Sequence, residues 1–312
     1  MPKSVLCFGA AGYIGSVLTP LLLNFGYKVT AIDNYLYRQN SLLDLCHHQN
    51  FNIIRGDVRD KKLLEEQIPK HDVIINLAAL VGMPSCKRNP LMAEQVNYEA
   101  VKNMMKLKSK DQLFLYPNTN SGYGQGEGII FTEESSLNPI SVYGITKCKS
   151  EKLIREYENT VVFRLATVFG ASPRFRLDLL VNDFTFKAWS DRYITLFESN
   201  FIRNYVYIGD VAELFIWSIN NWNSVKDQVF NFGLSNANLT KLELCNKIKK
   251  QISDFLITRA EIGKDPDQRN YIVSNEKIER TGFSATTSVD EGIKELIKSF
   301  QIINPYIYSN LT

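Results

Sequence analysis

Short apolar runs alternate with segments of helical periodicity along the first half of the chain. The apolar runs are rich in β-branched and aromatic residues and are bounded by turn or polar residues, which is typical of buried strands. They predict strands at residues 5–9, 28–33, 51–57, 72–79, 112–118 and 160–170. Helical spacing of apolar residues predicts helices at residues 13–25, 61–68, 90–109 and 143–158. This alternation predicts an α/β fold of the Rossmann type, a doubly wound parallel sheet with helices on both faces.

The second half of the chain is less regular. Its pattern predicts a strand with a helix, a further strand and two amphipathic helices, at residues 203–219, 228–233, 241–252 and 288–300. We expect a dinucleotide-binding domain over residues 1–168, to which residues 205–235 return. Residues 169–204 and 236–312 are expected to form a smaller α/β lobe that binds the substrate.

Composition excludes several classes of protein. Of the 312 residues, 45% are hydrophobic and 22% are charged, as in globular proteins and unlike disordered chains. The net charge of +3 argues against a protein that binds mainly nucleic-acid phosphates. No run of about 18 apolar residues occurs, so we expect no membrane span.

Cysteine and histidine usage narrows the chemistry further. The five cysteines are widely spaced, and the N-terminus leads into an apolar strand without a leader-like region, so we expect a cytoplasmic protein. Only three histidines occur, and two of them are adjacent in a polar segment. This argues against a Ser-His-Asp mechanism and against a histidine-rich metal site.

Three glycines, Gly9, Gly12 and Gly15, separate the first predicted strand from the first predicted helix. Glycines in this position let the backbone turn tightly and approach a ligand, and they let the helix pack closely on the strand. The free N–H groups at the start of the helix can then bind a pyrophosphate. The spacing predicts a dinucleotide site, to which we also assign Tyr13 and Ile14.

The acid that ends the next predicted strand, Asp33, can accept hydrogen bonds from the ribose hydroxyls of adenosine and would repel a 2′-phosphate. It therefore favours NAD over NADP, a selectivity that the nearby Arg38 weakens. Asp57 ends the third strand, where it can meet the adenine edge. The other cofactor residues are predicted at strand ends, and they are Asn34, Val58, Leu77, Ala78 and Ala79.

Tyr143 and Lys147 stand four residues apart in a predicted helix, so their side chains share one face. A phenol with a reference pKa of about 10 is a poor base at neutral pH. An adjacent ammonium and a positively charged nicotinamide ring favour the phenolate and lower its pKa. Tyr143 could then take a proton from a substrate hydroxyl while hydride leaves the same carbon for NAD. Both residues are therefore predicted to be catalytic and to contact the cofactor.

These features resemble the extended short-chain dehydrogenase/reductases, the NAD-dependent epimerase/dehydratase family that acts on nucleotide sugars. The resemblance covers nearly the whole chain and rests on the segments GAAGYIG, YGITK, RNYVYIGDVA, PDQRNYIVSNEKIERTGF and SVDEGIKELI. In this family the third catalytic group is a Ser or Thr four residues before the tyrosine of a YG pair. The resemblance thus implies Thr119, four residues before Tyr123, with Ser121 as the alternative.

The resemblance also implies how a nucleotide-diphosphate sugar is held. Arg203 and Arg269 match arginines that family members use on the diphosphate, a role that suits the bidentate guanidinium. Where the family usually has Asn in the segment R-Y-F-N, this chain has RLAT, which places Thr167 there. Asn182 is the residue expected to share that contact.

Oxidation at C4 of the sugar is the reaction that the resemblance implies as the first step. A 4,6-dehydratase would carry an Asp-Glu pair directly after Thr119, whereas Asn120 and Ser121 stand there and cannot act as an acid–base pair. A decarboxylase would carry Glu near the same turn, and that residue is missing too. Cys86, with Lys87 beside it, is a candidate for the base of a 3,5-epimerase, although a buried thiol is the more common situation.

Two reactions then remain, a 4-epimerase that returns the hydride to the opposite face and a 4-dehydrogenase that releases the keto sugar. The segments LAALVGMPSCKRNP, YPNTNSGYG, FRLATVFG, RLDLLVNDFTFKA and DPDQRNYIVSN look most like GDP-heptose (GDP-D-glycero-D-manno-heptose) 4-dehydrogenases of capsular polysaccharide pathways. This favours a 4-dehydrogenase acting on a GDP-sugar. A non-catalytic NAD-binding regulator would commonly lack the Tyr or Lys of YxxxK, and both are present here.

A homodimer is expected from the same resemblance, because family members usually pair through the helices at 90–109 and 143–158. The apolar positions that allow this pairing are Met92, Val96, Val101, Met104 and Met105. They could equally face the sheet.

Overall fold

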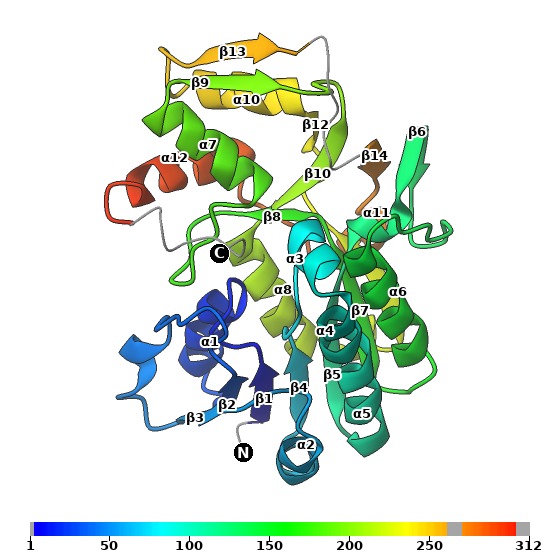
Figure 1. Cartoon of the computed structure of the whole chain (residues 1–312). Helices are drawn as coiled ribbons and strands as arrows, with labels where there is room; N and C mark the ends of the chain where they lie inside the picture. The colour runs from blue at the N-terminus through cyan, green and yellow to red at the C-terminus, as the bar shows by residue number, and fades with distance from the viewer. Residues whose placement is uncertain (1–2, 261–269, 304–312) are drawn as a thin grey trace.

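The computed structural model describes residues 3–260 and 270–303, and its centre is a seven-stranded parallel sheet (Figure 1). The strands are Ser4–Phe8 (β1), Lys28–Asp33 (β2), Phe51–Arg55 (β3), Val73–Asn76 (β4), Leu113–Thr119 (β5), Thr160–Leu165 (β7) and Gln228–Phe232 (β11). Their order is β11-β7-β5-β4-β1-β2-β3, so the direction of winding reverses between β1 and β4. The predicted Rossmann-type fold is confirmed.

Alternate residues of β1 enter two different cores, because successive side chains of a strand point to opposite faces. Val5 and Cys7 belong to the core on one face, and Leu6 and Phe8 belong to the core on the other. One face is covered by Gly15–Asn24 (α1) and Ile208–Asn220 (α8), and the other by Lys61–Gln67 (α2), Ala100–Leu107 (α5) and Val142–Ile154 (α6). Burial of both faces explains why the strand sequences are apolar throughout.

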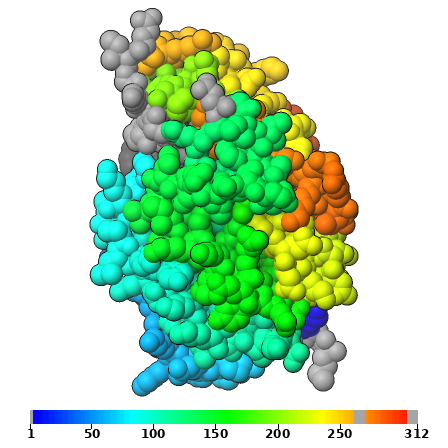
Figure 2. Space-filling model, turned by 90° about the vertical axis from the view of Figure 1, so that its right-hand side faces the viewer, coloured from blue at the N-terminus to red at the C-terminus, as the bar shows by residue number. Residues whose placement is uncertain are grey.

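The single helix predicted at residues 90–109 consists of three pieces in the structure. These are Pro90–Glu94 (α4), a π-helical turn at Gln95–Glu99 and α5. Four of the five apolar positions considered for a dimer, Val96, Val101, Met104 and Met105, are buried in the core between the sheet and the helices of this face. The outer surface of α5 and α6 lies on the face shown in Figure 2, and it is built from other side chains. The homodimer therefore stays a prediction.

A second lobe has its own core, which lies at the top of Figure 1. Its main helices are Leu180–Ser190 (α7), Lys241–Lys249 (α10) and Val289–Ser299 (α12). Small sheets join Thr167–Phe169 (β8), Ile202–Tyr207 (β10) and Asn238–Thr240 (β12), and pair Tyr193–Leu196 (β9) with Leu256–Arg259 (β13). Capping boxes begin α10 at Thr240 and α12 at Ser288.

The remaining elements are short. They are Met83–Arg88 (α3), Trp222–Val225 (α9), Glu276–Glu279 (α11) and the paired strands Gln125–Phe131 (β6) and Asn270–Val273 (β14). Across residues 3–260 and 270–303, no helix is both long enough and apolar enough to span a membrane.

Two sequence predictions differ from the structure at the border between the lobes. The strand predicted at residues 160–170 breaks at Ala166, after which β8 pairs with β10 instead of joining the main sheet. In the segment at residues 205–235, α8 packs in the core against the main sheet and β11 joins that sheet, whereas β10 pairs with β8 and β12. The division of the chain into two domains stays a prediction. The apolar run continues through the break, which is why periodicity alone did not reveal it.

Candidate active site

The turn after β1 places glycines where any side chain would clash. Gly9 has a φ of +72°, and a Cβ there would lie 2.6 Å from the backbone nitrogen of Ala78. A Cβ at Gly15 would lie 2.5 Å from the carbonyl oxygen of Ala10. Real Cβ atoms do not approach backbone this closely, so both positions require glycine.

The start of α1 presents unused hydrogen-bond donors. The backbone N–H groups of Tyr13, Ile14 and Gly15 have no acceptor within the part of the chain that the structure describes, and the N-cap residue makes no side-chain cap. Three N–H groups at the positive end of a helix dipole form an anion site. This matches the predicted position of the pyrophosphate.

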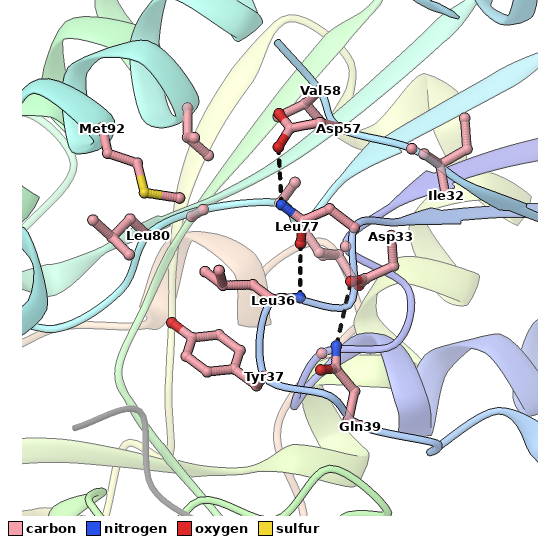
Figure 3. Close-up of a pocket in the computed structure, with 17 residues that line it drawn as sticks. Ile32, Asp33, Leu36, Tyr37, Gln39, Asp57, Val58, Leu77, Leu80 and Met92 are labelled. Carbon is pink, nitrogen blue, oxygen red and sulfur yellow. Dashed lines mark hydrogen bonds between the residues drawn. The ribbon is translucent and has the colours of Figure 1, made fainter. Parts of the chain in front are cut away.

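One pocket follows the carboxyl ends of β1, β2, β3 and β4 (Figure 3). Nine of the predicted cofactor residues line it, namely Gly9, Gly12, Asp33, Asn34, Asp57, Val58, Leu77, Ala78 and Ala79. The lining also includes eight residues that the sequence analysis missed, namely Ile32, Leu36, Tyr37, Gln39, Gly56, Leu80, Met92 and Val96. The pocket lies where open α/β sheets bind dinucleotides, beside the point at which the strand order reverses.

Asp33 is held against the pocket wall by three donors. Its Oδ2 accepts from the N–H of Ala11 at 3.1 Å, and its Oδ1 accepts from the N–H of Tyr35 at 2.8 Å. Its Oδ1 also accepts from Nε2 of Gln39 at 3.3 Å, the bond drawn from Asp33 in Figure 3. Burial raises the pKa of this carboxyl group, and the three hydrogen bonds oppose the rise. A carboxylate has about four acceptor positions, and three are used here, so Asp33 can still accept from one ribose hydroxyl.

Asp57 is engaged by a guanidinium that the sequence analysis did not consider. Arg59 donates from Nε to Oδ1 and from Nη2 to Oδ2, both at 2.9 Å, and Asn34 donates to Oδ2 at 3.0 Å. These bonds, above all those from Arg59, lower the pKa of Asp57 to about 2. The carboxylate therefore stays charged at neutral pH. Because Arg59 is bonded to it, the guanidinium would lie beside Asp57 at the predicted adenine edge.

The loop after β2 supplies three of the eight missed lining residues, Leu36, Tyr37 and Gln39. Two of its residues, Tyr35 and Arg38, have positive φ angles of 55° and 52°, which fold the loop back over the pocket. Tyr37 then faces the pocket, and the guanidinium of Arg174 from the second lobe lies over its ring at 4.8 Å. Non-glycine residues with positive φ carry no reliable sequence signal, so the loop could not be predicted.

The predicted catalytic residues come from β5 and α6, which pack against each other. Thr119 ends β5, and its Oγ1 accepts from the N–H of Ser121 at 3.1 Å and donates to the Oγ of Ser121 at 3.0 Å. Tyr143 is the second residue of α6, which begins after the N-cap Ser141. The end of the strand and the start of the helix thus lie together at the edge of the sheet that carries the pocket.

Lys147 follows Tyr143 by one helical turn and is 2% exposed. Its Nζ lies 3.7 Å from the ring centroid of Tyr116, and it forms no hydrogen bond or ion pair with any described residue. Burial lowers the pKa of Lys147 to about 7. A cation removed from water in this way needs acceptors from a bound molecule, because an unpaired buried charge is unfavourable.

Asn182, predicted to contact substrate, is fully buried, and its amide is used within the fold. Its Oδ1 accepts from the N–H of Gly170 at 3.1 Å, and its Nδ2 donates to the carbonyl of Arg176 at 2.9 Å and to the hydroxyl of Tyr13 at 3.3 Å. In this structure the amide links the glycine turn to the second lobe. The predicted contact of Asn182 with substrate stays a prediction.

The other predicted substrate residues lie in the second lobe or outside the described residues. Thr167 begins β8, and Arg203 lies on the neighbouring strand β10. Arg203 is 1% exposed, and its guanidinium lies 5.7 Å from the ring centroid of Tyr271. Arg269 falls outside the described residues. The roles of these three residues stay predictions.

Cys86 is not suited to act as a base. It is fully buried, and its Sγ donates to the carbonyl of Leu80 at 3.2 Å. Burial raises the pKa of this thiol to about 11, so it is protonated at neutral pH. All five cysteines are free thiols, and no group of three or more His, Cys, Asp or Glu among the described residues could hold a metal ion.

The arrangement of turn, pocket and helix has a counterpart among known families. The family described as "NAD dependent epimerase/dehydratase family" matches residues 5–233, which include the glycine turn, the pocket, Tyr143 and Lys147. The chain belongs to this family. The predicted family and the predicted cofactor, NAD, are thereby confirmed.

Several members with similar sequences or structures are named for epimerases, and others are named for different reactions, such as UDP-glucuronic acid decarboxylase 1 of Arabidopsis thaliana, 28% identical over 317 residues and covering 95% of this chain and 69% of that protein. A putative UDP-glucose 4-epimerase of Methanocaldococcus jannaschii is 26% identical over 310 residues, covering 94% of this chain and 97% of that protein. An uncharacterized UDP-glucose epimerase of Bacillus subtilis, YtcB, is 30% identical over 229 residues, covering 67% of this chain and 70% of that protein. The UDP-N-acetylglucosamine 4-epimerase of Methanobrevibacter ruminantium M1 superposes with a TM-score of 0.85 at 21% identity, covering 96% and 98% of the two chains, and this likeness shows the fold.

The residues of the chain fit NAD. The unused N–H groups at the start of α1 suit its pyrophosphate, and Asp33 suits a ribose. Lys147 supplies a buried ammonium whose donors the hydroxyls of a second ribose could satisfy. The glycine turn, Asp33 and Lys147 are thus the parts of the chain that would hold the cofactor.

Proposed function

We propose that this protein oxidises C4 of a nucleotide-diphosphate sugar with NAD. The observation that carries the proposal is Lys147, a buried lysine one turn after Tyr143 whose ammonium has no hydrogen-bonding partner among the described residues. Such a lysine stabilises a phenolate at Tyr143 once a bound cofactor supplies acceptors for its protons. A tyrosine with this neighbour can act as a base at neutral pH.

Each residue has a distinct task in this reaction. Tyr143 takes the proton of the C4 hydroxyl, and Thr119 holds that hydroxyl from the end of β5. Lys147 stabilises the negative charge on the phenolate. The glycine turn and Asp33 would hold NAD, which would supply the acceptor for the hydride of C4, so that proton and hydride would leave the same C–OH group and give a 4-keto sugar.

The fate of the keto sugar separates two candidate functions. The relatives named as UDP-glucose epimerases favour a 4-epimerase, in which the hydride returns to the opposite face of C4. The resemblance to GDP-heptose 4-dehydrogenases favours release of the keto sugar from a GDP-sugar, and the relatives described above do not support it. We therefore rank the 4-epimerase first and the 4-dehydrogenase second.

Two other reactions fit the residues poorly. Asn120, which follows Thr119, is 1% exposed, and neither atom of its amide has a hydrogen-bond partner among the described residues. An amide cannot exchange a proton as a carboxyl group does, so elimination of water is not supported. The protonated thiol of Cys86 likewise gives no support to a 3,5-epimerase.

Recognition of the substrate is proposed for the second lobe. Arg203 would bind the diphosphate, together with Arg269, and Thr167 would lie near the sugar. A homodimer through the outer surface of α5 and α6 belongs to the same proposal.

Product analysis tests the proposal. The purified protein is mixed with NAD and with UDP-, GDP-, dTDP- and CDP-sugars in turn, and the products are separated and weighed by mass spectrometry. An isomer of unchanged mass supports the 4-epimerase, and a product lighter by two hydrogens together with stoichiometric NADH supports the 4-dehydrogenase. Loss of water would contradict the exclusion of a dehydratase. No change with any sugar would count against the proposed substrate class.

A further inference from the structure

A buried ion pair lies beneath the catalytic end of α6. Arg164 on β7 and Glu151 on α6 are both 2% exposed, and Nη2 of Arg164 lies 2.5 Å from Oε1 of Glu151. Nε of Arg164 donates to both carboxylate oxygens, at 3.2 and 3.1 Å. Asn118, the residue before Thr119, donates to Oε2. Both oxygens of Glu151 are therefore occupied.

Arg164 is held in this position by contacts on its other side. Its Nη1 donates to the hydroxyl of Tyr123 at 2.8 Å and to the carbonyl of Glu133 at 3.1 Å. The Tyr123 hydroxyl in turn donates to Oδ1 of Asn231 at 2.6 Å. The guanidinium thus joins β7 to the turn after β5, to the end of β6 and to β11.

Glu151 is also the natural partner of a different cation. It follows Lys147 by four residues in α6, a spacing that places both side chains on one face. Both residues are buried, and attraction between opposite charges is far stronger away from water. Nevertheless no ion pair joins Lys147 to any carboxylate among the described residues, and its Nζ lies over the ring of Tyr116 instead.

We propose that Arg164 is a positioning residue that holds Glu151 away from Lys147 and so keeps the lysine available to Tyr143 and to the cofactor. The inference rests on the proposed function, since it takes the roles of Tyr143 and Lys147 from there. Without Arg164, Glu151 is a buried carboxylate in need of a cation, and Lys147, one turn earlier in the helix, is a buried cation with no ion pair among the described residues. An ammonium drawn to Glu151 no longer favours the phenolate of Tyr143.

The test compares Arg164→Met, Glu151→Gln and the double variant. We expect Arg164→Met to lower kcat at least about tenfold, part of the 10²–10⁴-fold that a general base supplies. The acidic limb of the pH profile of kcat/KM should move to higher pH, because Tyr143 then ionises less readily. In the double variant no carboxylate is left to capture Lys147, so kcat and the acidic limb should return close to those of the wild type.

Recovery of kcat when Glu151→Gln is added to Arg164→Met distinguishes a positioning role of Arg164 from a purely structural one. Loss of packing alone would leave the double variant as impaired as Arg164→Met, and that outcome overturns the proposal. Unchanged kcat and an unchanged acidic limb in Arg164→Met would overturn it equally. Lys149→Met is the matched control. Lys149 also lies on α6, and its substitution removes an exposed ion pair with Glu94 of α4, so the pH profile should stay unchanged.

Two further arms keep the outcome interpretable. Where Arg164→Met does not fold, Arg164→Lys replaces it. Lysine keeps the charge but cannot bridge both carboxylate oxygens, so a smaller shift of the acidic limb in the same direction is expected. Binding of NAD is measured for every variant by fluorescence, with Arg164→Met expected to bind more weakly and the double variant normally. A wild-type protein inactive on all sugars would count against the proposed function. An active wild-type protein whose NAD affinity and pH profile do not change when Arg164 is substituted would count against this inference alone.

Discussion

The cofactor side of the molecule and the second lobe use their predicted residues in different ways. On the cofactor side, nine predicted residues converge on one pocket, and they belong to the ends of four neighbouring strands. In the second lobe, Asn182 and Arg203 are almost completely buried, and the amide of Asn182 is hydrogen-bonded inside the fold. A cofactor site built from backbone groups and strand ends uses residues that are neighbours in the sequence. A substrate site built from side chains depends on which distant segments of the chain come together in the fold.

The proposed catalytic base, Tyr143, lies on the cofactor side, and we expect the largest effect when this base is removed. Tyr143→Phe keeps the ring but removes the base, so kcat should fall at least about 100-fold. The affinity for NAD should change little, because Asp33 and the glycine turn remain. The measurement is steady-state turnover beside NAD titration, with Tyr157→Phe just after α6 as the control. Turnover close to the wild type would show that the base lies elsewhere.

The glycine turn should be almost as intolerant as the base. A Cβ at Gly9 would lie 2.6 Å from the backbone of Ala78, so Gly9→Ala must displace the turn that presents the N–H groups of α1. Loss of one or two hydrogen bonds to the charged pyrophosphate should weaken NAD binding by about 100-fold. Isothermal titration with NAD measures the change.

Gly26→Ala is the matched control for Gly9→Ala. Gly26 also has a positive φ, of +84°, but nothing lies within 4 Å of a Cβ there. The substitution should cost about 1–2 kcal/mol in the free energy of unfolding and leave the affinity for NAD unchanged. Equal effects of the two alanines on NAD binding would show that backbone strain, not the approach to the cofactor, makes the turn sensitive.

The same contrast explains how far the sequence could predict this protein. Gly9, Gly15 and Asp33 follow from a strand–turn–helix motif whose parts are neighbours in the chain, so the fold and the cofactor pocket were predicted. The pair of Arg164 and Glu151 was not, because its members lie on different elements and only packing makes them partners. Likewise no sequence pattern shows that the amide of Asn182 reaches the glycine turn.

The Kd for NAD should depend on pH because Lys147 is buried. Burial lowers the pKa of this lysine to about 7, and ribose hydroxyls favour its charged form, so NAD binding should take up a proton above pH 7. We expect the Kd for NAD to be constant below pH 7 and to rise by up to about tenfold per pH unit above it. Titration with NAD between pH 6 and 9 measures this, and a flat profile would contradict the burial of an unpaired ammonium.

Lys147→Met supplies the control and a second readout on stability. The pKa of Lys147 in the folded chain lies below its ordinary value of 10.5, so the cost of burying the charge is fully present below pH 7. That cost disappears as the pH rises towards the ordinary value, and the cofactor-free protein should gain stability over this window. Lys147→Met should flatten both this gain and the pH dependence of the Kd.

The smallest effect is expected where the two regions meet. The hydroxyl of Tyr13, in the glycine turn, donates to the carbonyl of Gly170 at 2.8 Å and accepts from Asn182. Tyr13→Phe removes one donor and one acceptor and keeps the ring, so the free energy of unfolding should fall by about 1 kcal/mol. Chemical denaturation measures this fall.

Hydrogen exchange in α7, with and without NAD, tests whether the Tyr13 hydroxyl also transmits cofactor binding to the second lobe. In the wild type, NAD should slow exchange around Asn182, because the turn that binds the pyrophosphate is bonded to that amide. In Tyr13→Phe the protection of α7 by NAD should shrink while the protection of α1 persists. Equal protection of α7 in both proteins would mean that the lobe senses the cofactor by another route, such as the contact of Arg174 with Tyr37. The cofactor side and the lobe would then be coupled through the pocket wall rather than through the glycine turn.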